Sequence, residues 1–123
     1  MSGLRPLNLL ILDDDYARLH GGLSVAVSAA ALGRPVHVFF QGLAVRALVS
    51  DRLWPEDSAA RDKGVAAIKD LFVQAAELGI ALTACETGLH LASLTANVLP
   101  PGVETGGLIG FLSGAGDGDL LTI

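Results

Sequence analysis

The sequence predicts a single α/β domain in which helices cover both faces of a parallel β-sheet. Short apolar runs recur along the chain, and segments with apolar residues at helical spacing separate them. Glycine or proline stands at several of the junctions between these segments. Alternation of this kind is typical of parallel sheets with helices on both faces. Because 123 residues is the length of one domain, we take residues 1–123 as a single unit.

The first third of the chain is predicted to form a strand, a helix and a second strand. Residues 7–12 are a compact apolar run that ends in three aspartates, and residues 16–32 are alanine-rich and compatible with a helix. Gly33 is placed to end that helix. Residues 36–40 are β-branched and aromatic, as in a buried strand. Such a unit favours a right-handed crossover and a parallel strand pair.

The middle of the chain is predicted to hold a short helix over residues 42–49, a long loop over 50–61 and then a longer helix. The loop prediction rests on polar composition and on the Trp-Pro pair that begins at Trp54. Asp57 or Ser58 is expected to cap the longer helix. The apolar residues of that helix recur at helical spacing and are Val65, Ile68, Leu71, Phe72, Ala75 and Leu78.

The remainder of the chain supplies three further predicted strands. Gly79 ends the preceding helix, and the chain then continues into apolar segments separated by turns. The predicted strands are residues 80–84, 103–105 and 120–123, with helical segments at 86–94 and 107–112 between them. Together with the two earlier strands, they complete a sheet of five parallel strands.

Composition and charge exclude several kinds of partner. Thirteen acidic residues against eight basic ones give a net charge of −5, which argues against nucleic-acid binding because phosphate contacts need clustered Lys and Arg. No apolar run approaches the roughly 20 residues of a membrane span. Residues 1–6 lack the basic and long apolar regions of a signal peptide. We therefore expect a cytoplasmic protein that binds neither nucleic acid nor a membrane.

Three strings of residues are similar to those of a known family. They are Ala-Leu-Gly-Arg-Pro-Val-His-Val-Phe-Phe (31–40), Leu-Gly-Ile-Ala-Leu-Thr-Ala-Cys (78–85) and Val-Glu-Thr-Gly-Gly-Leu (103–108). In order and spacing, these strings resemble the DsrE-like family, which includes the sulfur-relay proteins DsrE and TusD. The resemblance spans nearly the whole chain.

The resemblance implies a three-layer α/β/α sandwich with a five-stranded parallel sheet. It also implies an oligomer, often a trimer or a hexamer, built from copies of this chain or with a related one. In the relay members a cysteine after the third strand carries sulfur as a persulfide, and Cys85 occupies that position here.

Cys85 is the residue predicted to carry chemistry. It lies between a predicted strand and a predicted helix, at the carboxyl edge of the sheet, where open α/β sheets bind ligands. A helix N-terminus stabilises a thiolate, whereas the adjacent carboxylate of Glu86 opposes one. A lone cysteine also packs well as a small buried residue, so a structural role for it stays open.

Five further residues form the candidate binding set. His20 lies near the start of the first helix, close to the same sheet edge, and Trp54 is interpreted either as an interface plug or as a lid over the site. His90 follows the cysteine by five positions, an offset that turns it partly away from the thiol. Glu86 and Gln41 complete the set.

The acidic and glycine-rich segments do not predict a metal or a cofactor. Residues 13–15 are three aspartates, which we interpret as a solvated cluster with one member capping the following helix rather than as a cation site. The three histidines and one cysteine do not form a metal-ligand pattern. Neither glycine pair, at 21–22 or 106–107, belongs to a phosphate-binding loop. We expect no cofactor.

The predicted function is sulfur transfer through a persulfide on Cys85. A single cysteine cannot form an internal disulfide, so turnover requires a thiol on a sulfur donor or acceptor protein. A phospho-receiver domain is suggested by residues 9–15 but rejected, because Asp51 does not follow a predicted strand and no lysine lies near the C-terminus. A non-catalytic oligomeric scaffold or small-ligand binder, with an inert Cys85, is the alternative that remains.

Overall fold

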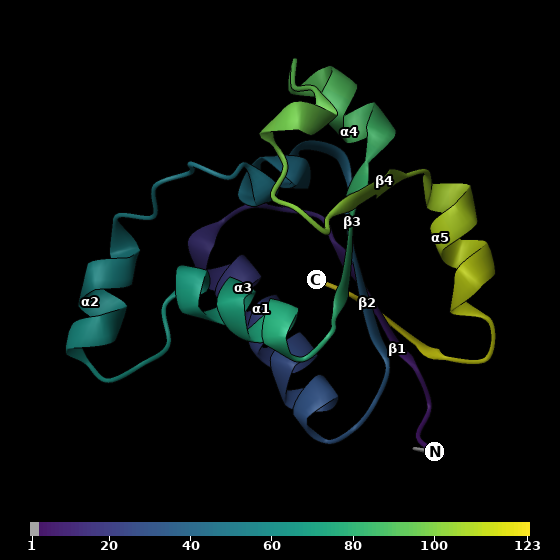
Figure 1. The fold of residues 1–123 in the computed structure, drawn as a ribbon, viewed down its shortest axis with the longest axis horizontal. Helices are drawn as coiled ribbons and strands as arrows, with labels where there is room; N and C mark the ends of the chain where they lie inside the picture. The colour runs from purple at the N-terminus through teal and green to yellow at the C-terminus, as the bar shows by residue number, and fades with distance from the viewer. Residues whose placement is uncertain (1–2) are drawn as a thin grey trace.

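The computed structural model describes residues 3–123 and consists of a five-stranded sheet with helices on both faces (Figure 1). Residues 1–2, the start of the segment examined for a signal peptide, lie outside the described residues. The strands are β1 (Leu7–Ile11), β2 (Val36–Phe40), β3 (Ala81–Cys85), β4 (Glu104–Gly106) and β5 (Asp119–Thr122). Their order in the sheet is β4-β3-β2-β1-β5, and all neighbours are parallel. The predicted α/β class and five parallel strands are confirmed.

In the part of the chain that the structure describes, seven helical segments connect and cover the strands. They are α1 (Tyr16–Ala31), the 3₁₀ helix η1 (Gly42–Leu48), α2 (Glu56–Asp62), α3 (Ile68–Glu77), α4 (Glu86–Leu91), the 3₁₀ helix η2 (Ala96–Val98) and α5 (Leu108–Ala115). Helices α1 and α3 lie on one face of the sheet, and α5 lies on the other (Figure 1). Within residues 3–123, no helix has the length and apolar character needed to cross a membrane.

The main core lies between the sheet and helices α1 and α3. Leu9 of β1 and Val38 of β2 are partners in register, and neither has exposed surface. Phe40 points to the same face, because side chains two positions apart in a strand share a face. Its ring stacks on Phe72 of α3, with 6.3 Å between the ring centroids. The residues of β1 and β2 on this face are all apolar, whereas the opposite face includes Asn8 and His37, so the long helices cover the more apolar face.

Helix α5 covers the opposite face (Figure 1). Its buried Phe111 lies 5.0 Å from Phe39 and 5.1 Å from His37, measured between ring centroids. The Nε2 atom of His37 is 2.8 Å from the hydroxyl oxygen of Thr83 on the neighbouring strand. His37 thus packs between the sheet and α5.

The structure corrects the prediction of one long loop over residues 50–61. Helix α2 begins at Glu56, and the next helix, α3, begins only at Ile68, so Val65 is exposed outside it. Asp57 does cap α3, but from inside α2. Its carboxylate accepts hydrogen bonds from the backbone N–H of Ile68 (3.0 Å) and Lys69 (3.2 Å). The first N–H groups of α3 are thus bound by Asp57, whereas in a continuous helix they would bond to carbonyl groups of the preceding turn. This is why α3 begins at Ile68 as a helix separate from α2.

The remaining differences lie at the ends of elements. The helix predicted over 86–94 ends at Leu91, and Ser93 has a left-handed backbone with φ of 57°. The helix predicted over 107–112 begins at Leu108 and continues to Ala115. The third, fourth and fifth strands are each shifted by one residue from the predicted bounds. None of these differences moves the end of β3, where the candidate cysteine lies.

Candidate functional site

Cys85 is the last residue of β3 and the N-cap residue of α4, as the sequence predicts. Its Sγ atom accepts a hydrogen bond from the backbone N–H of Gly88 at 3.3 Å. Only 3% of the residue is exposed. The thiol is therefore at the carboxyl edge of the sheet, beneath the first turn of a short helix and shielded from solvent.

Gly88 explains why α4 lies so close to the sheet edge. A Cβ atom at this position would lie 2.1 Å from the carbonyl oxygen of Gly42 and 2.9 Å from Cγ1 of Val45, both in η1. Real Cβ atoms do not approach backbone oxygen so closely, so only glycine allows α4 to pack against η1 in this way. The same packing brings the Gly88 N–H to the sulfur of Cys85.

Gln41 comes from the neighbouring strand and leaves the sheet at the same edge. Phe40 and Ala84 are partners in register, and Gln41 and Cys85 are the next residues along the two strands. The backbone N–H of Gln41 donates to the carbonyl of Ile11 at 2.9 Å. Its side-chain Oε1 is buried and has no hydrogen-bond partner among the described residues. Buried acceptors are rarely left unpaired, so this oxygen marks the edge as a candidate site.

The other candidates on α4 point to solvent. Glu86 is in the first turn of α4 and His90 is in its last turn, and both are exposed. The exposed His90 agrees with the predicted offset from the thiol. The structure therefore places these two side chains on the outside of the helix that covers Cys85.

His20 belongs to α1 and contacts the segment before α3. Its Nε2 atom is 2.8 Å from the carbonyl oxygen of Ala66, and its ring stacks on Tyr16 with 6.0 Å between centroids. These contacts connect α1 to the beginning of α3. They give the half-buried His20 a structural partner on the face of the sheet that α1 and α3 cover.

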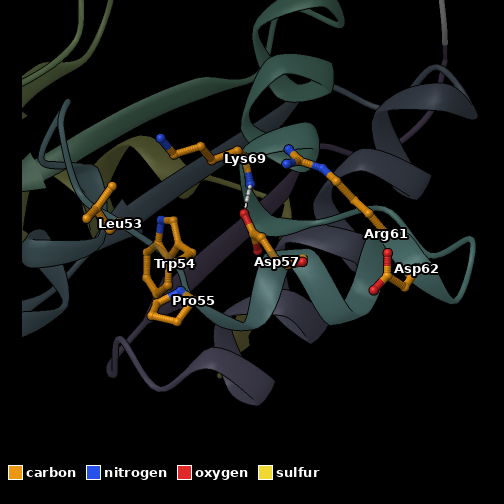
Figure 2. Close-up of a pocket in the computed structure, with 8 residues that line it drawn as sticks. Leu53, Trp54, Pro55, Asp57, Arg61, Asp62 and Lys69 are labelled. Atoms are coloured by element: carbon orange, nitrogen blue, oxygen red, sulfur yellow. Dashed lines mark hydrogen bonds between the residues drawn. The ribbon is translucent and has the colours of Figure 1, made fainter.

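Trp54 is buried, with 8% of its surface exposed. Its ring meets that of Tyr16 edge to face at 6.0 Å, and the guanidinium of Arg52 lies 3.9 Å above its centroid. Trp54 borders two cavities. One has a volume of about 540 Å³ and also includes Asp57 and Lys69 (Figure 2). The other, of about 260 Å³, lies toward β3 and β4, and Cys85 is in the wall of neither.

Two of the three consecutive aspartates stabilise the start of α1. The Asp15 carboxylate accepts a hydrogen bond from the N–H of Arg18 at 3.2 Å and so caps the helix, as expected of one member of this cluster. Asp13 accepts a hydrogen bond from the N–H of Asp15 at 3.0 Å. Within residues 3–123, no three His, Cys, Asp or Glu side chains gather closely enough to hold a metal ion.

Asp14 holds two arginines at the carboxyl edge, which sequence reasoning missed. Its carboxylate pairs with Arg52 at 2.7 Å and with Arg46 at 3.2 Å. Burial alone would raise the pKa of Asp14, but hydrogen bonds from the two guanidiniums hold it below the ordinary value. The acidic run was the only signal in the sequence. Its basic partners lie in η1 and in the following loop, far along the chain.

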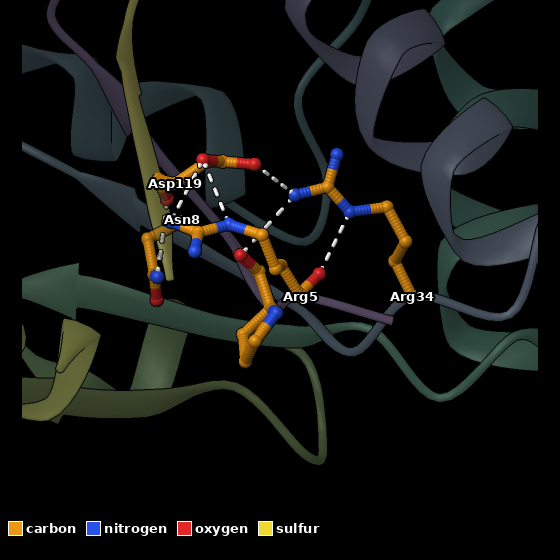
Figure 3. A network of polar contacts seen from close by, with 5 residues as sticks. Arg5, Asn8, Arg34 and Asp119 are labelled. Carbon is orange, nitrogen blue, oxygen red and sulfur yellow. Dashed lines mark hydrogen bonds and ion pairs between the residues drawn. The ribbon is translucent and has the colours of Figure 1, made fainter. Parts of the chain in front are cut away.

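The opposite, amino edge of the sheet is closed by a second polar network (Figure 3). Asp119 of β5 pairs with Arg34 at 2.5 Å and with Arg5 at 3.2 Å. The guanidiniums of Arg34 and Arg5 hold the pKa of Asp119 below its ordinary value. The side-chain amide of Asn8 donates to the backbone carbonyl of Asp119 at 3.2 Å. These contacts join β5 to the beginnings of β1 and β2 and leave the carboxyl edge as the candidate site.

The five-stranded all-parallel sheet and its covering helices define an α/β protein with a DsrE-like fold. The crystal structure of the YchN protein from E. coli is similar, with a TM-score of 0.79. The match covers 98% of this chain and 100% of the YchN chain, at 16% sequence identity. At this identity the likeness shows the fold alone. No protein-family model matches the sequence, and no curated protein matches it.

Proposed function

We propose that this protein carries sulfur as a persulfide on Cys85, taking it from one partner thiol and passing it to another. The observation that supports this proposal best is the position of Cys85 at the carboxyl end of β3, with the N–H of Gly88 directed at its Sγ atom. A backbone N–H stabilises negative charge on sulfur, and a thiolate is the reactive form of cysteine.

The chemistry requires no second cysteine in this chain. In loading, the Cys85 thiolate attacks the outer sulfur of the donor persulfide, the S–S bond of the donor breaks, and the donor leaves as a thiolate. In delivery, the acceptor thiolate attacks the outer sulfur on Cys85, which is released as a thiolate. Each step exchanges one S–S bond for another, so neither an oxidant nor a reductant is consumed. This agrees with a chain that has one cysteine.

The buried position of Cys85 suits storage of a reactive sulfur. With 3% of the residue exposed, water and small thiols have little access to it. The unpaired Oε1 of Gln41, at the neighbouring position of the sheet edge, is available to accept the proton of a protonated persulfide. Loading then requires displacement of α4, which is one short helix of 6 residues.

The test is mass spectrometry of the native protein after exposure to glutathione persulfide. We expect the wild type to gain the mass of one sulfur atom and Cys85→Ser to gain none while remaining folded by circular dichroism. His90→Ala serves as a matched control in the same helix, since His90 is exposed, and it is expected to load like the wild type. A sulfur gain retained in Cys85→Ser would contradict the proposal.

The alternative is a non-catalytic scaffold or ligand-binding protein in which Cys85 is inert. The burial of the thiol favours this reading as well, because buried cysteines without function are common. Alkylation of Cys85 in the native protein, compared with the unfolded protein, separates the two. A carrier is expected to be alkylated in the native state, whereas an inert core residue reacts only after unfolding.

We further propose that the protein forms a homo-oligomer, either a trimer or a hexamer, through the face that carries α5. Three large apolar residues are exposed there: Ile109 (87%) and Leu112 (45%) on α5, and Leu120 (45%) on β5. Leu120 is the register partner of Asn8, so it points to the α5 face and away from the main core. Exposed apolar residues that gather on one face support contact with a partner subunit.

A further inference from the structure

We propose that the cavity of about 260 Å³ between η1, α3 and the segment before β4 binds a small monocarboxylate with a hydrocarbon tail. This inference does not rest on persulfide chemistry, because Cys85 is not in the cavity wall. The cavity lies on the face covered by α3, beside Leu82 of β3 and Val103, which precedes β4.

The wall is mostly apolar and is shaped by rigid elements. Leu48 of η1 is buried, and Phe72 of α3 and Leu82 of β3 are half-buried, so apolar surface of the core margin is open to the cavity. Pro100 and Pro101, which have fixed φ angles, also line the cavity. An apolar cavity of roughly 150 Å³ is enough to bind benzene, so this larger one has room for a longer hydrocarbon.

The polar end of the cavity is basic. Arg52 and Lys69 are in the wall, and no acidic residue is among the described residues that form it. This differs from the chain as a whole, in which acids outnumber bases by 13 to 8. Local charge in the cavity therefore favours an anion.

The two cationic side chains differ in whether a carboxylate already binds them. Arg52 pairs with Asp14 at 2.7 Å and lies over the ring of Trp54, so its guanidinium is already engaged and its position is fixed. Lys69 forms no ion pair with another described residue, and only its backbone N–H is bound by Asp57. Its side chain extends away from Arg61, on the side of Trp54 (Figure 2).

The ammonium group of Lys69, which has no carboxylate partner among the described residues, and the apolar wall together determine which class of ligand fits the cavity. A single negative charge matches the cation of Lys69, whereas a dianion or polyphosphate would need a second free cation, and the other cation of the wall, Arg52, is already bound by Asp14. A carboxylate is a compact monoanion, and a hydrocarbon tail fits the apolar wall. The cavity is smaller than the usual range for drug-sized ligands, which restricts the tail to a medium-chain or single-ring group.

Trp54 provides the signal for the test, because it is the only tryptophan of the chain and borders the cavity. We expect octanoate to produce a saturable change in tryptophan fluorescence. Octanamide, which has the same shape and no charge, is expected to bind about fivefold more weakly, as one partly exposed ion pair contributes. Lys69→Met should remove this preference, while Lys63→Met should keep it, since Lys63 is the other lysine and is not in the wall.

A second variant tests the site without removing a cation. Val73 is in the wall and 58% exposed, so Val73→Asp is expected to fold and to abolish octanoate binding by placing a carboxylate in the cavity. Binding must also persist in Cys85→Ser, which separates this site from the persulfide proposal. Absence of saturable binding, equal affinity for acid and amide, or a preference that survives Lys69→Met would each overturn the inference.

Discussion

At the scale of single residues, Asp57 joins three helices with one carboxylate. It belongs to α2, accepts a hydrogen bond from the Tyr16 hydroxyl of α1 at 2.6 Å, and caps α3 through the N–H groups of Ile68 and Lys69. Burial alone would raise the pKa of Asp57. The hydrogen bonds from Tyr16 and the two backbone groups outweigh burial and hold this pKa below its ordinary value. The charged form is therefore the one that the fold stabilises.

Asp57→Ala is expected to lower the free energy of unfolding by about 2 to 3 kcal/mol at pH 7, because it removes a helix cap and leaves buried donors unpaired. The pKa of Asp57 is lower in the folded state than the unfolded value of about 3.9. Its stabilisation is therefore present above pH ~4 and lost as the pH falls through the folded pKa. Urea unfolding from pH 7 down to pH 3 should show the difference in unfolding free energy between Asp57→Ala and the wild type becoming smaller.

The exposed neighbour Ser58 gives the control, and Ser58→Ala should change stability by less than about 0.5 kcal/mol. A difference independent of pH would count against this account.

At the scale of elements, the packing of α4 against η1 keeps α4 in place over Cys85. The contact depends on the absence of a side chain at Gly88, where a Cβ atom would lie 2.1 Å from a backbone carbonyl oxygen. Backbone atoms cannot rotate away as a flexible side chain can. Any larger residue must therefore displace the short helix or distort η1.

Gly88→Ala is expected to cost about 1 to 3 kcal/mol of stability and to speed alkylation of Cys85, because the displaced helix exposes the thiol. Gly110→Ala is the matched control. Gly110 is also helical but has no atom near its Cβ position, so alanine there should stabilise the protein by about 0.5 to 1 kcal/mol and leave alkylation unchanged. Denaturation curves and alkylation rates measured on the same samples test both effects. An unchanged alkylation rate in Gly88→Ala would mean that α4 does not control access.

The elements also show how far sequence reasoning reaches. β2 was predicted with its observed bounds because β-branched and aromatic residues fill Val36–Phe40. The position of Cys85 followed from the end of the next apolar run. Helix α2 was missed because its sequence, Glu-Asp-Ser-Ala-Ala-Arg-Asp, has no apolar period, and its one buried residue is Asp57.

The properties of the site depend on contacts between distant segments and could not be predicted. The burial of Cys85 and the unpaired oxygen of Gln41 arise at an edge where η1 and α4 pack together. The pairing of Asp14 with Arg52 joins the end of β1 to the loop after η1. No local pattern in the sequence indicates that these distant segments lie close together.

At the scale of the whole molecule, several large apolar residues are exposed, and three of them, Ile109, Leu112 and Leu120, lie on the α5 face. We expect Ile109→Asp combined with Leu120→Lys to reduce the mass measured by sedimentation to that of a single chain, because charges within an apolar contact are costly to bury. Leu32→Asp is the control, since Leu32 is 75% exposed but lies at the end of α1. A mass that stays the same in all three proteins would place the subunit contact elsewhere, or show that there is none.

The strand order has a geometric consequence for that face. From β1 the chain steps to β2, β3 and then β4 in one direction, with α1 and α3 as the first two crossovers. It then returns past all of these strands to β5 through α5. Crossovers are right-handed, so reversing the direction of travel moves the connecting helix to the other side of the sheet. Five strands at about 4.8 Å make a layer roughly 20 Å wide, whereas one helix is about 10 Å across. A chain wound in this order therefore leaves about half the width of its second face bare, whatever residues it carries there.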